Sequence, residues 1–245
     1  MSKFTKKQTS DKQLILYGRH AVLAALKNKK RQIHKIICTK ENADEIKKAT
    51  SLIPQIAEKK DIDKLLPPDS VHQGFALYCS RLADYSLEEI IEMASDKERC
   101  HVLILDQITD PQNIGTIIRS AVAFNTLALI MQDKNSPLES GAMAKAAVGT
   151  LEHLPVARVT NLSRAIEKLK KAGFWVVGMD GYAKTTIDQL DKSGKTAIIM
   201  GSEGKGMRRL VEENCDIAVK LPMSELAESL NVAAAAAIAL YEINK

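Results

Sequence analysis

The sequence predicts a two-domain α/β protein, with a small N-terminal α/β domain and a larger domain built on a mostly parallel sheet. Short apolar runs alternate with helical patterns along most of the chain, which is typical of a parallel sheet covered on both faces. An acidic, helix-prone stretch gives way abruptly to the apolar run HVLILD at residue 101, and such a change marks a domain boundary. With 245 residues, 45% of them hydrophobic, the chain can bury at least one sizeable core without disulfide or metal staples.

The N-terminal domain is expected over residues 12–80, between a flexible start at residues 1–11 and a linker at residues 81–98. Its apolar periodicity predicts helices over residues 18–27, 43–49 and 61–66, and strands over residues 33–39 and 74–79. Because helices and strands alternate here too, we expect a compact α/β unit.

The C-terminal domain is expected over residues 99–245 and continues the alternation of strand and helix. Its strands are predicted at residues 102–106, 127–131, 175–179, 197–200 and 217–221. Its helices are predicted at residues 114–124, 162–171, 207–214 and 230–244. The last helix carries an alanine run at residues 233–237, and such small side chains indicate close helix packing.

The positive charge of the chain is concentrated at its N-terminal end. Residues 1–80 carry 16 Lys and Arg against 8 Asp and Glu, while the net charge of the whole chain is only +5. A basic domain is typical of a module that binds a polyanion, because neutralised phosphates release their counterions. A solvated basic terminus is the alternative interpretation of the same residues.

Several classes of protein are disfavoured by the composition. The start of the chain lacks the apolar core of a signal peptide, and no stretch approaches 18 apolar residues, so we expect a cytoplasmic protein without a membrane partner. The four cysteines are too far apart for paired zinc ligands and too few for a disulfide framework: Cys38, Cys79, Cys100 and Cys215. They are interpreted as reduced thiols.

The first segment that carries chemistry is LDQITDPQNIGTIIRSAVAF, residues 105–124. Its isoleucines follow the spacing of a buried helix stripe, and Arg119 falls outside that stripe. The Arg119 guanidinium can therefore face a cleft at the carboxyl end of the preceding strand, where open α/β sheets place ligands. Asn113 lies near the helix start, where a cap for free backbone N–H groups is the simpler interpretation. A plain surface charge is likewise the simpler interpretation of Arg119.

The second segment is AIIMGSEGKGM, residues 197–207, an apolar strand that runs into a glycine-rich turn. Such a turn allows close approach of a ligand to the backbone. The spacing of Gly201, Gly204 and Gly206 matches neither a dinucleotide nor a Walker pattern, which disfavours a phosphate-cradling nucleotide site. Glu203 in the turn suits a cationic or hydroxyl-bearing ligand, or an arginine partner.

The third segment is VKLPMSELAESLNVAAAAAIALYE, residues 219–242. Pro222 ends a strand, and Ser229 or Asn231 begins the terminal helix, so small polar groups gather at one strand–helix junction. Considered alone, each of these residues is more typical of a helix cap than of a ligand.

Taken together, the three segments resemble the three motifs of the SpoU/TrmH family of SPOUT RNA methyltransferases, across residues 99–245. The sequences YGRHAV at residues 17–22 and VHQG at residues 71–74 resemble the family's N-terminal substrate-binding domain. This second match points to the RlmB-like members, which methylate a guanosine 2′-hydroxyl of 23S ribosomal RNA.

The resemblance implies a fold, a cofactor and partners. It implies an RNA-binding domain similar to ribosomal protein L30e, followed by a SPOUT domain with a deep trefoil knot, which periodicity alone does not predict. Family members bind S-adenosylmethionine mainly through backbone groups, which by position are those of Gly201, Leu221 and Leu230, with Met223 nearby. Family members are also homodimers whose active site is completed across the interface. The expected macromolecular partner is 23S ribosomal RNA or its precursor particle.

The resemblance also assigns catalytic roles. It makes Arg119 the residue that activates the acceptor hydroxyl, while Asn113, Glu203, Ser229 and Asn231 position the reacting groups. A guanidinium is too basic to act as a general base near neutral pH, so we expect Arg119 to anchor a phosphate and stabilise the developing alkoxide. No metal is required. The 2′-hydroxyl distinguishes RNA from DNA, so DNA is not expected as a partner.

In the N-terminal domain, an RNA-facing role is expected for Arg19, His20, His72 and Gln73, with a structural role as the alternative. The chain departs from the family at Ala233, where serine is frequent, and at Glu225, where glycine is frequent. Both changes bear on cofactor affinity. Two alternatives to the ribosomal RNA enzyme are the same chemistry on transfer RNA and a non-catalytic RNA-binding or ribosome-assembly protein. A nucleotide hydrolase is weaker, because the glycine turn fits no phosphate motif.

Overall fold

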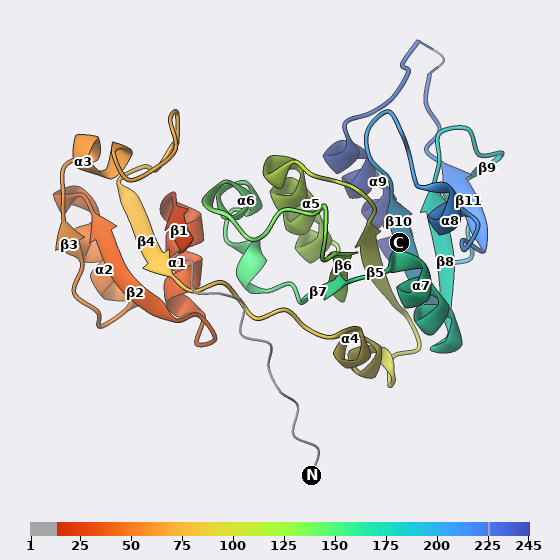
Figure 1. The fold of residues 1–245 in the computed structure, drawn as a ribbon, viewed down its shortest axis with the longest axis horizontal. Coiled ribbons are helices and arrows are strands. Elements are labelled where there is room, and N and C mark those ends of the chain that lie inside the picture. The colour runs from red at the N-terminus through yellow and green to blue at the C-terminus, as the bar shows by residue number, and fades with distance from the viewer. Residues whose placement is uncertain (1–13, 225) are drawn as a thin grey trace. The chain divides into compact units, whose positions relative to one another are not determined.

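The computed structural model describes residues 14–224 and 226–245, which form two compact units that meet in sequence at Leu82 and Ala83 (Figure 1). The start expected to be flexible and the departure from the family at Glu225 lie outside the described residues. Within the described ranges, no helix is both long enough and apolar enough to span a bilayer.

The first unit is built on a four-stranded sheet in the order β1-β4-β2-β3. Its strands are β1 (Leu14–Tyr17), β2 (Ile33–Cys38), β3 (Gln55–Ile56) and β4 (Phe75–Cys79). Its helices are α1 (Arg19–Lys27), η1 (Lys40–Asn42), α2 (Ala43–Ala49) and α3 (Lys59–Asp63). β4 is antiparallel to β1 and β2, and β3 adds a short parallel edge. The three helices and two longer strands predicted here are present.

The second unit is built on a seven-stranded sheet in the order β7-β6-β5-β10-β8-β11-β9, and every pair in it is parallel. Its strands are β5 (Cys100–Leu105), β6 (Ala128–Gln132), β7 (Val156–Val159), β8 (Phe174–Met179), β9 (Thr185–Thr186), β10 (Lys195–Met200) and β11 (Ile217–Lys220). The predicted parallel sheet is therefore confirmed. The two edge strands, β7 and β9, were not predicted.

Helices cover both faces of this sheet (Figure 1). They are α4 (Leu87–Ala94), α5 (Pro111–Ala123), α6 (Gly141–Ala147), α7 (Leu162–Lys171), α8 (Arg209–Glu212) and α9 (Val232–Asn244), with short 3-10 turns η2 (Thr150–Glu152) and η3 (Ile187–Gln189). α4, α7 and α8 share one hydrophobic core with the strands, whereas α5 packs with α6 and α9.

Helix α4 occupies part of the segment expected to be a linker. It begins with a capping box between Ser86 and Glu89, and its Leu87, Ile90 and Ala94 are buried in the core of the second unit. Residues 83–98 therefore belong to that unit, because burial of the apolar face fixes the helix there.

The sheet order brings the three sequence motifs to one edge. β10 lies between β5 and β8, and β11 follows β8, so the carboxyl ends of these parallel strands are neighbours. The loops that begin at residues 106, 201 and 221 leave the sheet at this edge. Ligands of open α/β sheets bind at such an edge.

Candidate active site

A cavity of about 510 Å³ lies beyond the carboxyl ends of β8, β10 and β11. All four positions that the resemblance assigns to the cofactor line it: Gly201, Leu221, Met223 and Leu230. Glu203 and Ser229 line the same cavity. Its volume lies within the range of sites that bind small molecules, roughly 300–1,000 Å³.

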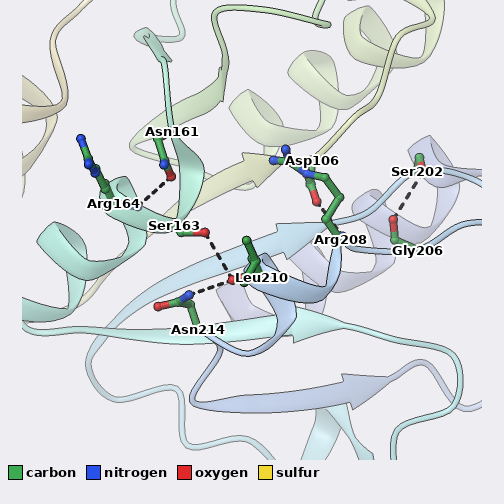
Figure 2. Close-up of polar contacts among 9 residues, drawn as sticks. All are labelled: Asp106, Asn161, Ser163, Arg164, Ser202, Gly206, Arg208, Leu210 and Asn214. Carbon is green, nitrogen blue, oxygen red and sulfur yellow. Dashed lines mark hydrogen bonds and ion pairs between the residues drawn. The ribbon is translucent and has the colours of Figure 1, made fainter.

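The glycine turn forms one wall of this cavity and closes on itself. The Ser202 N–H donates to the Gly206 carbonyl at 3.0 Å, and the Gly206 N–H donates back to Ser202 at 2.9 Å (Figure 2). Gly206 has a φ of 66°, which favours glycine. At Gly201, a Cβ atom would lie 2.3 Å from the carbonyl carbon of Gly206, so only glycine fits this crossing.

The three motifs meet at the side chain of Asn231. Its Nδ2 donates to Asn113 Oδ1 at 3.1 Å and to Glu203 Oε1 at 2.9 Å. The same Glu203 oxygen also accepts a hydrogen bond from the backbone N–H of Val232 at 2.9 Å. Asn231 is thus joined by direct hydrogen bonds to two residues that lie 28 and 118 positions away in sequence.

Asn231 is a helix cap and part of the network at once. Its Oδ1 accepts from the backbone N–H groups of Ala233 and Ala234, at 3.0 and 3.4 Å, and so caps α9. The two interpretations of this residue are therefore compatible. Asn113 is not a cap, because Asp110 caps α5 by accepting a hydrogen bond from the Gln112 N–H.

Arg119 lies apart from this network. It is exposed on α5, it is not among the residues that line the cavity, and no described side chain or backbone group pairs with its guanidinium. In this single chain Arg119 therefore does not line this cavity, and its part in the site stays a prediction beside the simpler interpretation as a surface charge. Arg119 lies about two turns into α5, which runs back along the sheet and away from the carboxyl ends of the strands.

His72 is buried in the first unit. Its Nδ1 accepts a hydrogen bond from the Gly74 N–H at 3.0 Å, so its Nε2 carries the proton and donates to Asp63 at 2.9 Å. With both ring nitrogens used and 6% of its surface exposed, His72 agrees with the structural alternative weighed for it. Its role is to hold the turn before β4.

The other three candidates in this unit lie around the start of α1. The Arg19 backbone N–H donates to Gln73 Oε1 at 3.3 Å, which brings the two segments that resemble the family together. The Arg19 side chain forms a two-point ion pair with Glu45, with Nε 3.0 Å from the carboxylate. His20 is exposed. Of the four candidates, Arg19, His20 and Gln73 keep an exposed position.

Two residues beside the cavity were missed. Asp106, fully buried at the end of β5, accepts hydrogen bonds from the backbone and side chain of Arg208 (Figure 2). The signal in the sequence is an aspartate directly after a strand and an arginine directly after the glycine turn. A carboxylate at the end of a buried strand needs a cationic partner, and Arg208 is in reach.

Comparison with known proteins identifies the family. The SpoU rRNA Methylase family model matches residues 101–241, and a model for RNA 2′-O ribose methyltransferase substrate binding matches residues 15–85. The chain is 36% identical to 23S rRNA (guanosine-2′-O-)-methyltransferase RlmB of Pseudomonas syringae pv. tomato, over 93% of each chain. It is 35% identical to the putative TrmH family tRNA/rRNA methyltransferase YacO of Bacillus subtilis, over 92% of this chain and 93% of YacO.

A solved structure confirms the expected SPOUT fold. The SpoU methyltransferase AviRb from Streptomyces viridochromogenes, crystallised with its cofactor AdoMet, superimposes with a TM-score of 0.79 at 24% identity. The superposition covers 95% of this chain and 89% of AviRb. On the family models and the relatives together, this chain belongs to the SpoU rRNA methylase family and is a methyltransferase.

Proposed function

We propose that this methyltransferase transfers a methyl group from S-adenosylmethionine to a ribose 2′-hydroxyl of RNA, and that the acceptor is a guanosine of 23S ribosomal RNA. The observation that carries the proposal is the hydrogen-bonded set of Asn113, Glu203 and Asn231 beside the cavity. The RlmB relative supports the choice of RNA, because the similarity extends over the substrate-binding unit as well.

The residues around the cavity fit S-adenosylmethionine. Apolar contacts for an adenine ring are offered by Leu221, Met223 and Leu230. At Gly201 the wall of the cavity is backbone, because a side chain there would collide with the backbone of Gly206. Charged side chains of both signs suit the amino and carboxylate groups of the methionine part: Asp180, Glu228, Lys205 and Lys220. When bound, the cofactor supplies an electrophilic sulfonium methyl group.

The chain's own residues then align the acceptor. Methyl transfer is an in-line displacement, so its rate depends on how well the acceptor oxygen is held. Asn113 Oδ1 accepts the hydrogen bond from Asn231, which leaves the Asn113 Nδ2 hydrogens for an acceptor ribose or phosphate. Glu203 holds Asn231 and the first N–H of α9, so its role is to orient rather than to take the proton.

Arg119 meets the acceptor from outside the cavity. Its exposed guanidinium is suited to anchor a phosphate and to stabilise the alkoxide that develops as the proton leaves to phosphate or water. We expect a second copy of the chain to complete the site around Arg119, as the family resemblance implies. The same resemblance leads us to expect the deep trefoil knot and a cytoplasmic location.

The decisive experiment incubates the protein with methyl-labelled S-adenosylmethionine and separate pools of unmodified 23S ribosomal RNA and transfer RNA. We expect label only in 23S RNA, in dinucleotides that resist alkali because the 2′-oxygen is methylated. Label confined to transfer RNA would change the substrate. Absence of label in both pools and in a ribosomal precursor particle, despite binding of cofactor and RNA, would favour the non-catalytic alternative.

A further inference from the structure

We propose that the buried pair of Asp106 and Arg208 is a positioning device for methyl transfer, which sets where the glycine turn presents Glu203 to Asn231. This inference rests on the proposed function and assigns to that site two positioning residues. Neither Asp106 nor Arg208 lines the cavity, so the pair acts through other groups and does not touch the cofactor.

The pair is built with more contacts than an ordinary ion pair. Asp106 Oδ2 accepts from the Arg208 backbone N–H at 2.9 Å, and Oδ1 accepts from Nε and from a terminal guanidinium nitrogen, both at 2.8 Å (Figure 2). Asp106 has no exposed surface, whereas about a third of the Arg208 side chain is exposed. A fully buried carboxylate is tolerated only where its charge is paired and hydrogen-bonded, so loss of the Arg208 side chain leaves the charge unpaired and removes both donors to Oδ1, while the backbone N–H still bonds Oδ2.

The pair fixes the base of the glycine turn to the strand that leads to Asn113. The Asp106 N–H also donates to the Met200 carbonyl at 2.9 Å, so the two strand ends are tied before their loops diverge. From Asp106 the chain turns at Gln107, with a φ of 58°, and enters α5. From Arg208 the chain runs back through Gly206 into the turn that carries Glu203.

These contacts form a closed circuit around the site. One arm runs from Asp106 through α5 to Asn113, and the other runs from Arg208 through the closed turn to Glu203. The two arms meet at Asn231, which donates to both. A circuit with two side-chain links holds the spacing of Asn113 and Glu203 from both sides, and removal of the Asp106–Arg208 link leaves the Asn231 link together with the backbone pairing of β5 and β10.

The first test compares Arg208→Ala and Arg208→Lys with the same changes at Arg209. Arg209 is the adjacent residue, and its exposed ion pair with Glu213 lies outside the circuit, so its variants are the matched controls. We expect Arg208→Ala to lower kcat by about 100-fold, the scale for a misplacement of about 1 Å. Arg208→Lys should restore part of kcat, and KM for RNA should change far less than kcat.

A double-mutant cycle separates positioning from general stability. If Arg208 acts through Glu203, the kcat loss from Arg208→Ala must shrink several-fold when Glu203 is already replaced by alanine. Equal losses in both backgrounds, or a kcat that merely follows the folded fraction in thermal unfolding, would overturn the proposal.

A cofactor-binding measurement keeps this inference distinguishable from the proposed function. Arg208→Ala should weaken S-adenosylmethionine binding by about tenfold in calorimetry, because the glycine turn that lines the cavity loses its side-chain contact with Asp106. Arg209→Ala should leave the affinity unchanged. If the wild type methylates no RNA but this difference is found, the proposed substrate fails and the positioning role stands. If affinity is the same in both variants and kcat is unchanged, the positioning role fails.

Discussion

At the scale of single residues, the wall that the glycine turn forms in the cavity requires a residue without a Cβ at Gly201. In Gly201→Ala, the new Cβ would overlap backbone atoms of Gly206 and Met207, at 2.3 and 2.4 Å, so the turn must open. We expect affinity for S-adenosylmethionine, measured by calorimetry, to fall at least about tenfold, which corresponds to about 1.4 kcal/mol. Gly181→Ala is the matched control, because Gly181 lines the same cavity and has open space around it. Equal affinities in the two variants would contradict the prediction.

A second prediction at this scale concerns His20 and His72, two of the three histidines of the first unit. His72→Ala removes the acceptor of the Gly74 N–H and the donor to Asp63, so it should destabilise the unit by about 1–3 kcal/mol in chemical denaturation. His20→Ala, at an exposed position, should leave stability unchanged. RNA affinity of the folded protein should fall for His20→Ala and not for His72→Ala. The reverse order would restore the RNA-facing role of His72.

At the scale of elements, Asn231 both caps α9 and bonds the site residues Asn113 and Glu203. The variant Asn231→Asp tests these two roles separately. Aspartate caps a helix as well as asparagine does, so the melting temperature should change little. The variant loses the Nδ2 donor to Asn113 and places a second carboxylate beside Glu203, so kcat should fall by about 100-fold. Asn231→Ala is the comparison, since it should lose both stability and activity. An Asp variant with normal turnover would show that the amide bridge is dispensable.

Strand β5 carries a pH-dependent contribution to stability. Burial lowers the pKa of His101 below its usual 6.5, and its Nε2 has no hydrogen-bond partner among the described residues. Below about pH 6.5 the unfolded chain therefore binds a proton that the folded chain does not bind, so stability falls as the pH falls. The denaturation midpoint should drop between about pH 7.5 and pH 5.5, and His101→Gln should flatten that slope. An unchanged slope in the variant would assign the effect to other groups.

The elements that the sequence predicted are those with strong periodicity. The helices α5, α7 and α9 lie within a few residues of their expected positions, and so do the buried strands β5, β6, β8 and β10 and the half-buried β11. Helix α6 was missed because its GAMAKAA sequence has no polar face to mark a period. The missed edge strands are short, and their pairing is set by neighbours distant in sequence.

At the scale of the whole molecule, the resemblance located the motifs but not how they meet. The hydrogen bonds of Asn231 to Asn113 and Glu203 span loops that only the sheet order brings together, so no local pattern contains them. The Asp106–Arg208 pair was missed for the same reason. The exposure of Arg119 agrees with its place outside the buried stripe, but its absence from the cavity lining was not evident, because helix periodicity does not show what a helix face lies against.

The two compact units lead to a prediction about where the second one begins. A chain of residues 83–245 keeps α4, whose Leu87, Ile90 and Ala94 are buried with the sheet, and should fold and bind S-adenosylmethionine like the full chain. A chain of residues 99–245 lacks that helix and exposes the apolar surface beneath it. Truncation of one buried leucine or isoleucine side chain lowers the free energy of unfolding by about 2–5 kcal/mol. The shorter chain should therefore melt at a clearly lower temperature.

Calorimetry and thermal unfolding of the two truncated chains, with the full chain as control, test that boundary. Equal melting temperatures would show that residues 83–98 act as a linker after all. The longer chain should also lack the preference for 23S RNA over transfer RNA that we propose for the full chain, because the basic substrate-binding unit is absent. Preserved selectivity would place RNA discrimination within the methyltransferase unit, on the surface that carries Arg119.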